Sequence, residues 1–191
     1  VAVAMRVMKK YGDDYIITAL FHDLLEDTDA TEEEILQLSN SRVLKAVKLL
    51  TKTKNISSKN YITGILSNGI AKAVKCEDRI HNLQCALETD DPIFILRYLR
   101  NTEEYYVGKF DNRLDAECKK LKDYFESLRN RYLFTLDTSV EGLIYRTDQR
   151  TNESCVYNRE EKRWIPCDPY FWADIGDFSK AVSIEEAEKL I

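Results

Sequence analysis

The chain has 191 residues and a formal net charge of −5, with basic and acidic side chains interspersed. This balance argues against a nucleic-acid-binding protein, which would carry a basic domain, and no apolar run approaches the ~20 residues that a membrane span needs. The five cysteines are widely spaced without a CxxC pair, which argues against a disulfide framework and a thiolate zinc site. No signal peptide is visible, and the odd number and wide spacing of the cysteines favour a reducing, cytoplasmic setting.

The first two thirds of the sequence have the apolar spacing of helices. Gly12 ends the first expected helix, and Thr31 with Glu34 forms a capping box that starts a later one. The polar segment 51–58 is expected to be a loop. The expected helices cover residues 1–11, 14–26, 31–38, 42–50, 61–67, 70–86, 93–106 and 112–131.

From Leu133 onward the sequence has β-like runs separated by polar turn residues. The three runs start at Gly142, Ser154 and Arg163, and a capping box of Ser183 with Glu186 starts a short terminal helix. We therefore predict a mainly α fold, with a helical domain over residues 1–132 and a small β-hairpin and helix appendage over residues 133–191. Aromatic side chains of the appendage are expected to pack its sheet, with a partner- or ligand-binding face as the alternative; they are Tyr145, Tyr157, Trp164, Tyr170, Phe171 and Trp172.

One histidine and three carboxylates stand within six residues of a segment that otherwise has the pattern of a buried helix. On a continuous helix His22 would lie one turn from Glu26, and Asp23 one turn from Asp27. Burying unpaired charge is costly, so these groups must pair with or coordinate something. Imidazole and carboxylate suit manganese, iron or zinc. The alternative is a core histidine paired with a neighbouring aspartate.

A second stretch, Lys75 to Leu83, places Asp78 and Asn82 four residues apart on one helical face. Asp78 can supply a distant third metal ligand. Asn82 can offer its amide to a substrate or to a bound water. The alternative is a solvated helix face with an ion pair between Asp78 and Arg79.

The two stretches together, HDxxED followed about 50 residues later by KxxDRxHN, resemble an HD-domain metal-dependent phosphohydrolase of the RelA/SpoT type. More specifically, they resemble the (p)ppGpp 3′-pyrophosphohydrolase domain, which is a helical bundle. Supporting matches at 1–4, 49–52 and 97–106 extend the resemblance over about residues 1–110. The remaining residues are too few for a synthetase domain, so the chain resembles the small stand-alone hydrolases.

The resemblance implies a metal site in which two histidines and two aspartates hold manganese, with iron and zinc as alternatives. His22, Asp23 and Asp78 match three of these ligands. The fourth would be a histidine just before Val1, so we expect that the sequence is truncated at its N-terminus.

The resemblance also implies catalytic and substrate-binding roles. Glu26 and Asp27 match the pair that positions and activates the attacking water, and Asn82 matches a residue that contacts the nucleotide. Lys52 and Lys54 lie in a loop that can face phosphates, with ordinary surface lysines as the alternative. The implied activity is hydrolysis of the 3′-pyrophosphate of guanosine alarmones of the stringent response. The alternatives are an HD-type hydrolase of another nucleotide or phosphorylated metabolite, and a non-catalytic nucleotide-binding module.

Three positions depart from the family pattern. Glu77 stands where the family commonly has alanine, and Gln84-Cys85 replaces an Arg-Thr pair near the nucleotide. These departures concern the substrate rather than the fold. The expected partner is a small nucleotide, with no nucleic acid and no membrane, and homo-oligomer formation is left open.

Overall fold

The computed structural model describes residues 1–140, 142–171 and 175–191, and it divides into two compact units. The first unit contains residues 1–88 and 99–121, and the second contains residues 89–98 and 122–191. Two helices therefore contribute to both units: α8 (Pro92–Tyr105) and α9 (Asn112–Arg129). None of the helices in the described ranges is long and apolar enough to cross a membrane.

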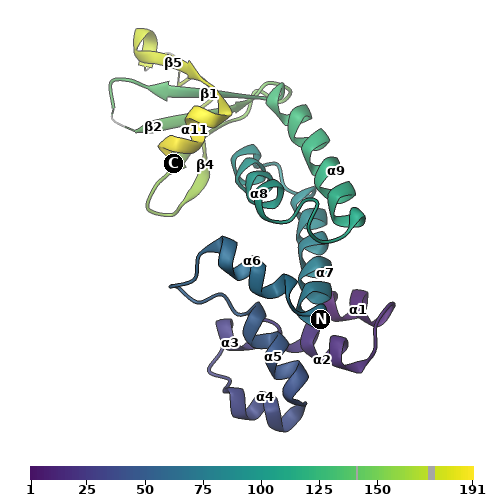
Figure 1. The fold of residues 1–191 in the computed structure, drawn as a ribbon. Helices are drawn as coiled ribbons and strands as arrows, with labels where there is room; N and C mark the ends of the chain where they lie inside the picture. The colour runs from purple at the N-terminus through teal and green to yellow at the C-terminus, as the bar shows by residue number, and fades with distance from the viewer. Residues whose placement is uncertain (141, 172–174) are drawn as a thin grey trace. The chain divides into compact units, whose positions relative to one another are not determined.

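The regular elements in the described residues of the first unit are all helices (Figure 1). Besides parts of α8 and α9, they are α1 (Ala2–Met8), α2 (Asp13–Phe21), α3 (Leu24–Asp27), α4 (Glu32–Leu38), α5 (Ser41–Leu50), α6 (Ser58–Leu66) and α7 (Gly69–Ala86). The predicted capping box at Thr31 and Glu34 is confirmed at the start of α4.

Helix α7 is the central element of the first unit. It packs against α1, α2, α5 and α6, and its apolar side chains Val74, Ile80 and Leu83 are buried. The predicted break at Asn68-Gly69 is where α7 begins, because the Asn68 side chain accepts a hydrogen bond from the Ala71 N–H at 2.9 Å. This cap fixes the start of the helix that carries the second sequence motif.

We expect Asn68→Ala to lower the free energy of unfolding by about 1 kcal/mol, because the capping bond to the Ala71 N–H is lost. Urea denaturation followed by circular dichroism measures the change. Asn68→Ser, which can still cap the helix, is the control. Equal stabilities of the two variants would contradict the role of this cap.

The helix predicted over residues 14–26 is interrupted in the middle of its motif. Helix α2 ends at Phe21, and α3 starts at Leu24. Asp23, with φ −105° and ψ −3°, lies between the two helices as the residue that precedes α3. The stacking of His22 over Glu26 on one continuous helix is therefore wrong, and the two side chains come from either side of the break.

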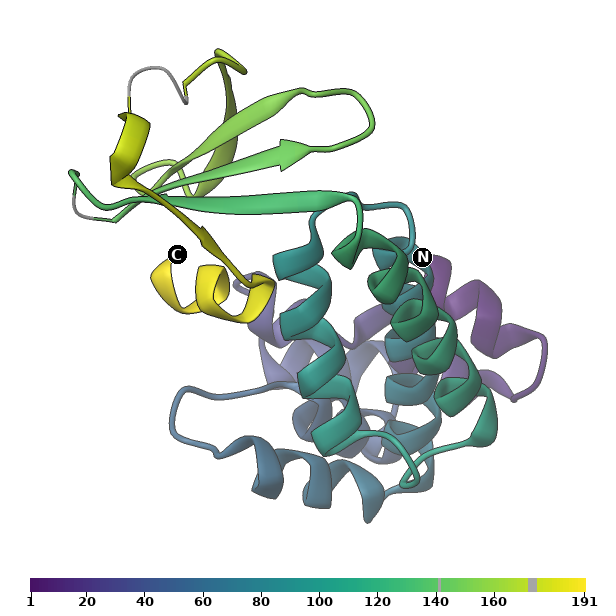
Figure 2. The ribbon, with the colours of Figure 1, turned by 90° about the horizontal axis from the view of Figure 1, so that it is seen from above.

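The second unit is organised around a five-stranded antiparallel sheet in the order β4-β3-β2-β1-β5. Its strands are β1 (Tyr132–Asp137), β2 (Leu143–Asp148), β3 (Ser154–Asn158), β4 (Arg163–Cys167) and β5 (Ser179–Val182). A short 3₁₀ helix (Gly176–Phe178) precedes β5, and α11 (Ile184–Leu190) follows it with the predicted capping box of Ser183 and Glu186. Figure 2 shows the strands and α11, which contacts β1.

The predicted class, a mainly α helical bundle with a small β-plus-helix appendage, needs correction. Three β runs were predicted, whereas the part of the chain that the structure describes contains five strands, and β1 and β5 were missed. Strand β5 has only four residues and pairs with β1, in the register Phe134 to Val182 and Asp137 to Ser179. A strand this short, whose partner lies far earlier in the chain, leaves little local pattern in the sequence. The chain therefore combines a helical unit with a unit built on a sheet.

Most of the aromatic side chains of the second unit pack within it. Tyr145 stacks on Phe171 with ring centroids 4.0 Å apart, and Trp164 meets Tyr157 edge to face at 5.2 Å. Tyr170 is exposed. Trp172 lies outside the described residues.

Candidate active site

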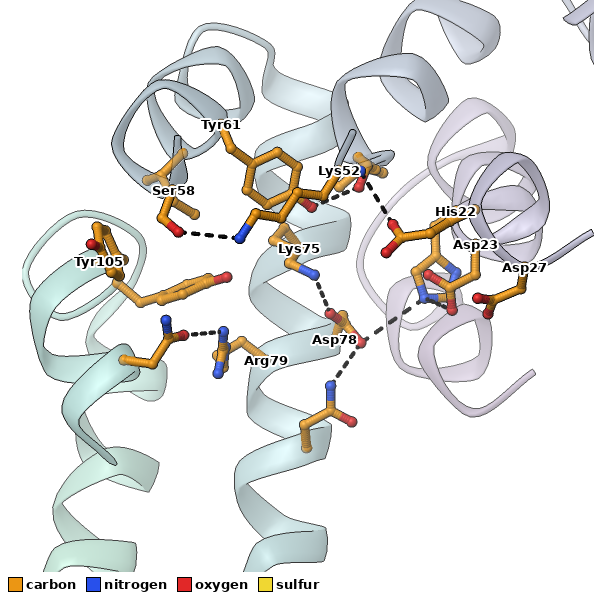
Figure 3. Close-up of a pocket in the computed structure, with 16 residues that line it drawn as sticks. His22, Asp23, Asp27, Lys52, Ser58, Tyr61, Lys75, Asp78, Arg79 and Tyr105 are labelled. Carbon is orange, nitrogen blue, oxygen red and sulfur yellow. Dashed lines mark hydrogen bonds and ion pairs between the residues drawn. The ribbon is translucent and has the colours of Figure 1, made fainter. Parts of the chain in front are cut away.

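A cavity of about 350 Å³ opens in the first unit, and its wall is mostly polar. Apart from Lys54, the residues predicted from the sequence to act in the site line this cavity (Figure 3). Those residues are His22, Asp23, Glu26, Asp27, Lys52, Asp78 and Asn82. They come from the α2–α3 junction, from the loop after α5 and from α7. The folding of the helices therefore brings both sequence motifs to one place.

The imidazole of His22 is oriented by the backbone and directed at two carboxylates. Its Nδ1 lies 2.9 Å from the Ala19 carbonyl oxygen, which can only accept, so Nδ1 carries a proton. Its Nε2 lies 2.9 Å from Asp23 Oδ2 and 3.9 Å from Asp78 Oδ1. The pKa of Asp23 is raised, mainly through loss of hydration at the cavity wall; His22 opposes the shift and Asp78 adds to it.

This donor set fits a divalent cation by its chemistry. In a neutral ring protonated at Nδ1, the Nε2 lone pair of His22 faces the oxygens of Asp23 and Asp78, and three acceptors repel one another unless a cation or proton lies between them. Donors around one such ion lie ~3–4 Å apart, because each lies ~2 Å from the metal. Within the described ranges, however, no group of three or more His, Cys, Asp or Glu side chains already has the arrangement of a metal site. Binding would therefore require the carboxylates to draw together.

Asp78 is held by two neighbours on its own helix. Its Oδ2 accepts from Lys75 Nζ at 2.8 Å, and its Oδ1 accepts from Asn82 Nδ2 at 3.1 Å. Burial would lower the pKa of Lys75, but the contact with Asp78 raises that pKa above its ordinary value. The alternative of an exposed Asp78–Arg79 ion pair is wrong, because Asp78 pairs with Lys75 instead and both Asp78 and Arg79 are buried.

Glu26 and Asp27 are exposed at the edge of the cavity. Glu26 Oε2 accepts a hydrogen bond from the backbone N–H of Lys52 at 3.1 Å, which links α3 to the loop after α5. The Lys52 ammonium donates to Ser58 Oγ at 3.1 Å and lies 5.9 Å from the ring centre of Tyr61. Both contacts are neutral groups, so neither balances the charge of Lys52. Lys54 does not line the cavity.

The cavity also contains residues to which the sequence assigned no role. Arg79 is buried, donates to Asn101 Oδ1 at 2.9 Å and stacks over the Tyr106 ring at 3.9 Å. Tyr61, whose pKa is raised by burial, donates its hydroxyl proton to the Leu50 carbonyl at 2.6 Å. Lys75 stands three residues before Asp78, and on a helix this spacing predicts their ion pair. Helix α8 contributes Asn101 and Tyr105 to the cavity wall, and their positions there depend on tertiary packing.

Comparison with known proteins gives one partial similarity. The chain is 42% identical over 77 residues to an enzyme of Aquifex aeolicus (strain VF5) named guanosine-3′,5′-bis(diphosphate) 3′-pyrophosphohydrolase. The matched region covers 36% of this chain and 11% of that enzyme, so the chain spans only a small part of its relative. No family model matches the chain. The similarity supports a relationship to hydrolases of this kind.

Proposed function

We propose that the first unit is an HD-type, metal-dependent phosphohydrolase that removes the 3′-pyrophosphate of guanosine alarmones, (p)ppGpp. The observation that carries this proposal is the composition of the cavity, whose wall combines an imidazole, several carboxylates and two lysines. Such a wall can hold a cation and a polyphosphate together. The substrate class rests on the partial similarity to the Aquifex enzyme and on the paired motifs.

His22, Asp23 and Asp78 are the residues that would hold the ion, which we expect to be manganese, with iron and zinc as alternatives. The bound ion would polarise a phosphoryl oxygen and lower the pKa of bound water. The Ala19 carbonyl fixes the His22 ring so that Nε2 faces the other donors. Asn82 and Lys75 orient the Asp78 carboxylate.

Glu26 is the proposed general base, and Asp27 orients it or assists. Glu26 takes a proton from the attacking water, whose oxygen forms a bond to the phosphorus next to the 3′ oxygen. The bond between that phosphorus and the 3′ oxygen breaks, inorganic pyrophosphate leaves, and the 3′ oxygen takes up a proton. The exposure of Glu26 at the cavity edge leaves room for water beside its carboxylate.

Lys52 and Asn82 are the proposed substrate-binding residues. The Lys52 ammonium contacts the neutral Ser58 hydroxyl and the Tyr61 ring, so its charge is available to phosphate oxygens. The Asn82 amide carbonyl can accept a hydrogen bond from the nucleotide while its Nδ2 donates to Asp78. Lys52 would therefore contact the phosphates, and Asn82 the nucleoside.

The direct test is manganese-dependent release of pyrophosphate from ppGpp by the full chain. Chelation with EDTA should abolish release, and added manganese should restore it. Release from other nucleotides but not from ppGpp would support a hydrolase of another metabolite and overturn the alarmone assignment. Saturable binding of ppGpp without hydrolysis would favour the non-catalytic binding module.

We expect Lys52→Gln to raise the KM for ppGpp by about 10- to 100-fold, because one charge-assisted phosphate contact is worth about 1.5–3 kcal/mol. The effect on kcat should be smaller. Lys54→Gln is the matched control, since Lys54 lies in the same loop but does not line the cavity. Equal KM values for the two variants would contradict a phosphate contact at Lys52.

A further inference from the structure

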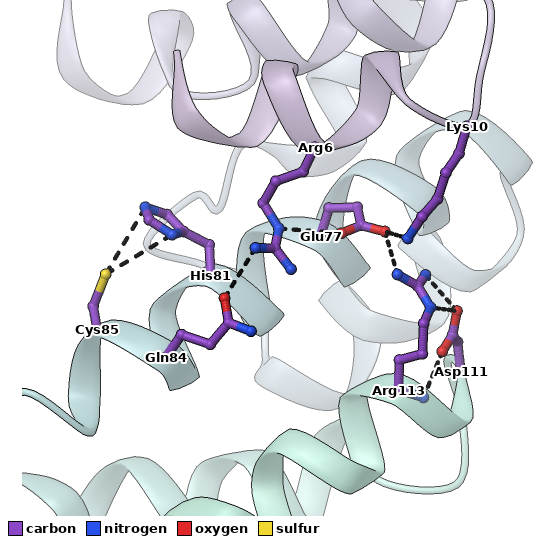
Figure 4. A network of polar contacts seen from close by, with 8 residues as sticks. All are labelled: Arg6, Lys10, Glu77, His81, Gln84, Cys85, Asp111 and Arg113. Atoms are coloured by element: carbon purple, nitrogen blue, oxygen red, sulfur yellow. Dashed lines mark hydrogen bonds and ion pairs between the residues drawn. The ribbon is translucent and has the colours of Figure 1, made fainter.

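Helix α7 carries a second carboxylate that does not line the cavity. Glu77 is 1% exposed and receives three cationic side chains (Figure 4). Arg6 Nε lies 3.2 Å from Oε2, while Lys10 Nζ and Arg113 Nη1 lie 2.9 Å and 2.8 Å from Oε1. A carboxylate this deeply buried is stable only because these charges compensate it.

The Arg6 side chain links α1 to two residues of α7 that lie about two turns apart. Its Nε contacts Glu77, and its Nη1 donates to Gln84 Oε1 at 2.9 Å. Glu77 and Gln84 are seven residues apart, so they lie on the same helical face about two turns from each other. The planar guanidinium has a fixed geometry and holds both acceptors at once. Rotation of α7 about its axis would break both contacts.

Arg113 connects Glu77 to a third segment. It contacts Glu77 through Nη1 and Asp111 Oδ2 through Nη2 at 2.6 Å, next to the start of α9. Helix α1, helix α7 and the beginning of α9 therefore meet at one buried carboxylate within the first unit. The cluster restrains α7 from two directions.

Glu77 and Asp78 are consecutive, and consecutive side chains of a helix diverge by about 100°. Glu77 faces α1, and Asp78 faces the cavity. We propose that Glu77 is a positioning residue which, with Arg6 and Gln84, fixes the rotation of α7 and thereby holds Asp78 within the metal donor set. This inference rests on the proposed function, in which Asp78 is a metal ligand.

The test compares Glu77→Gln with wild type by isothermal titration of manganese and by ppGpp hydrolysis. Glu77→Gln keeps the shape of the side chain and removes its charge. We expect about tenfold weaker manganese binding and about tenfold lower kcat with an unchanged KM, as for other residues that orient metal ligands. Glu77→Asp, which keeps the charge, should recover most of the manganese affinity. Glu32→Gln is the matched control, because Glu32 forms an exposed ion pair with Lys48 in the same unit.

Wild-type manganese affinity and kcat in a folded Glu77→Gln variant would overturn the positioning role. If Glu77→Gln does not fold, Arg6→Lys decides by the same two measurements, because lysine keeps the charge but cannot hold Glu77 and Gln84 together. If the wild-type chain binds manganese but does not cleave ppGpp, the proposed function is refuted. The manganese affinities of the variants then still test the positioning role. A wild-type chain that binds no manganese overturns that role as well.

Discussion

Replacing Asp78 by asparagine is expected to lower kcat for ppGpp hydrolysis by at least about 100-fold, because losing a metal ligand costs more than losing a residue that orients one. Asp78 Oδ1 lies 3.9 Å from His22 Nε2, and its carboxylate is the metal donor that we propose for α7. Manganese affinity, measured by titration calorimetry, should fall in parallel. The asparagine keeps an amide oxygen for Lys75, so the variant should remain folded.

Asp78→Ala separates the catalytic loss from a structural one. Both substitutions remove the anionic partner of Lys75, but alanine also leaves the largely buried ammonium without any acceptor from position 78, which adds a stability loss of up to about 3 kcal/mol. The two variants should therefore share the loss of activity and differ in thermal midpoint. Asp78→Asn hydrolysing ppGpp within threefold of the wild-type rate would exclude Asp78 as a metal ligand.

Glu26→Gln should lower kcat by about 100- to 10,000-fold, the range for removing a general base. Glu26 is exposed, and glutamine retains an acceptor for the Lys52 N–H, so the free energy of unfolding should change by no more than about 0.5 kcal/mol. Manganese affinity should be unchanged, because Glu26 is not one of the proposed ligands. Kinetic assays, calorimetry and thermal unfolding measure these three quantities.

Glu33→Gln, an exposed substitution on α4, is the control for Glu26→Gln. A Glu26→Gln variant with near-wild-type kcat would refute the assignment of the base. Reduced manganese affinity in the same variant would indicate that Glu26 is a metal ligand rather than the general base.

Features that depend on local hydrogen bonds could be predicted from the sequence. The capping boxes at Thr31 and Ser183 are formed by side chains three residues from their partners, so the pattern contains the whole interaction. The start of α7 at Asn68-Gly69 has the same local origin. The grouping of the predicted site residues around one cavity needed only the two motifs and the fold that they imply.

Features that depend on contacts between residues far apart in the sequence were not predicted. The break at His22-Asp23 contains neither glycine nor proline, so no strong local signal marks it. Strand β5 is defined by its pairing with β1. The buried position of Arg79, between Asn101 and the Tyr106 ring, depends on the packing of α8 against α7 and leaves no trace in the helical pattern of α7.

The cluster around Glu77 has a consequence for how this chain can diverge from its relatives. Glu77 and Gln84 occupy positions that depart from the family pattern, and both are bound by Arg6. Arginine at position 84 would bring a further cation to Arg6, and alanine at position 77 would leave its cations without their shared anion. Either substitution made alone would therefore carry an electrostatic cost. We therefore expect the residues at positions 6, 77 and 84 to co-vary among homologues, so that a change at one position accompanies changes at the other two.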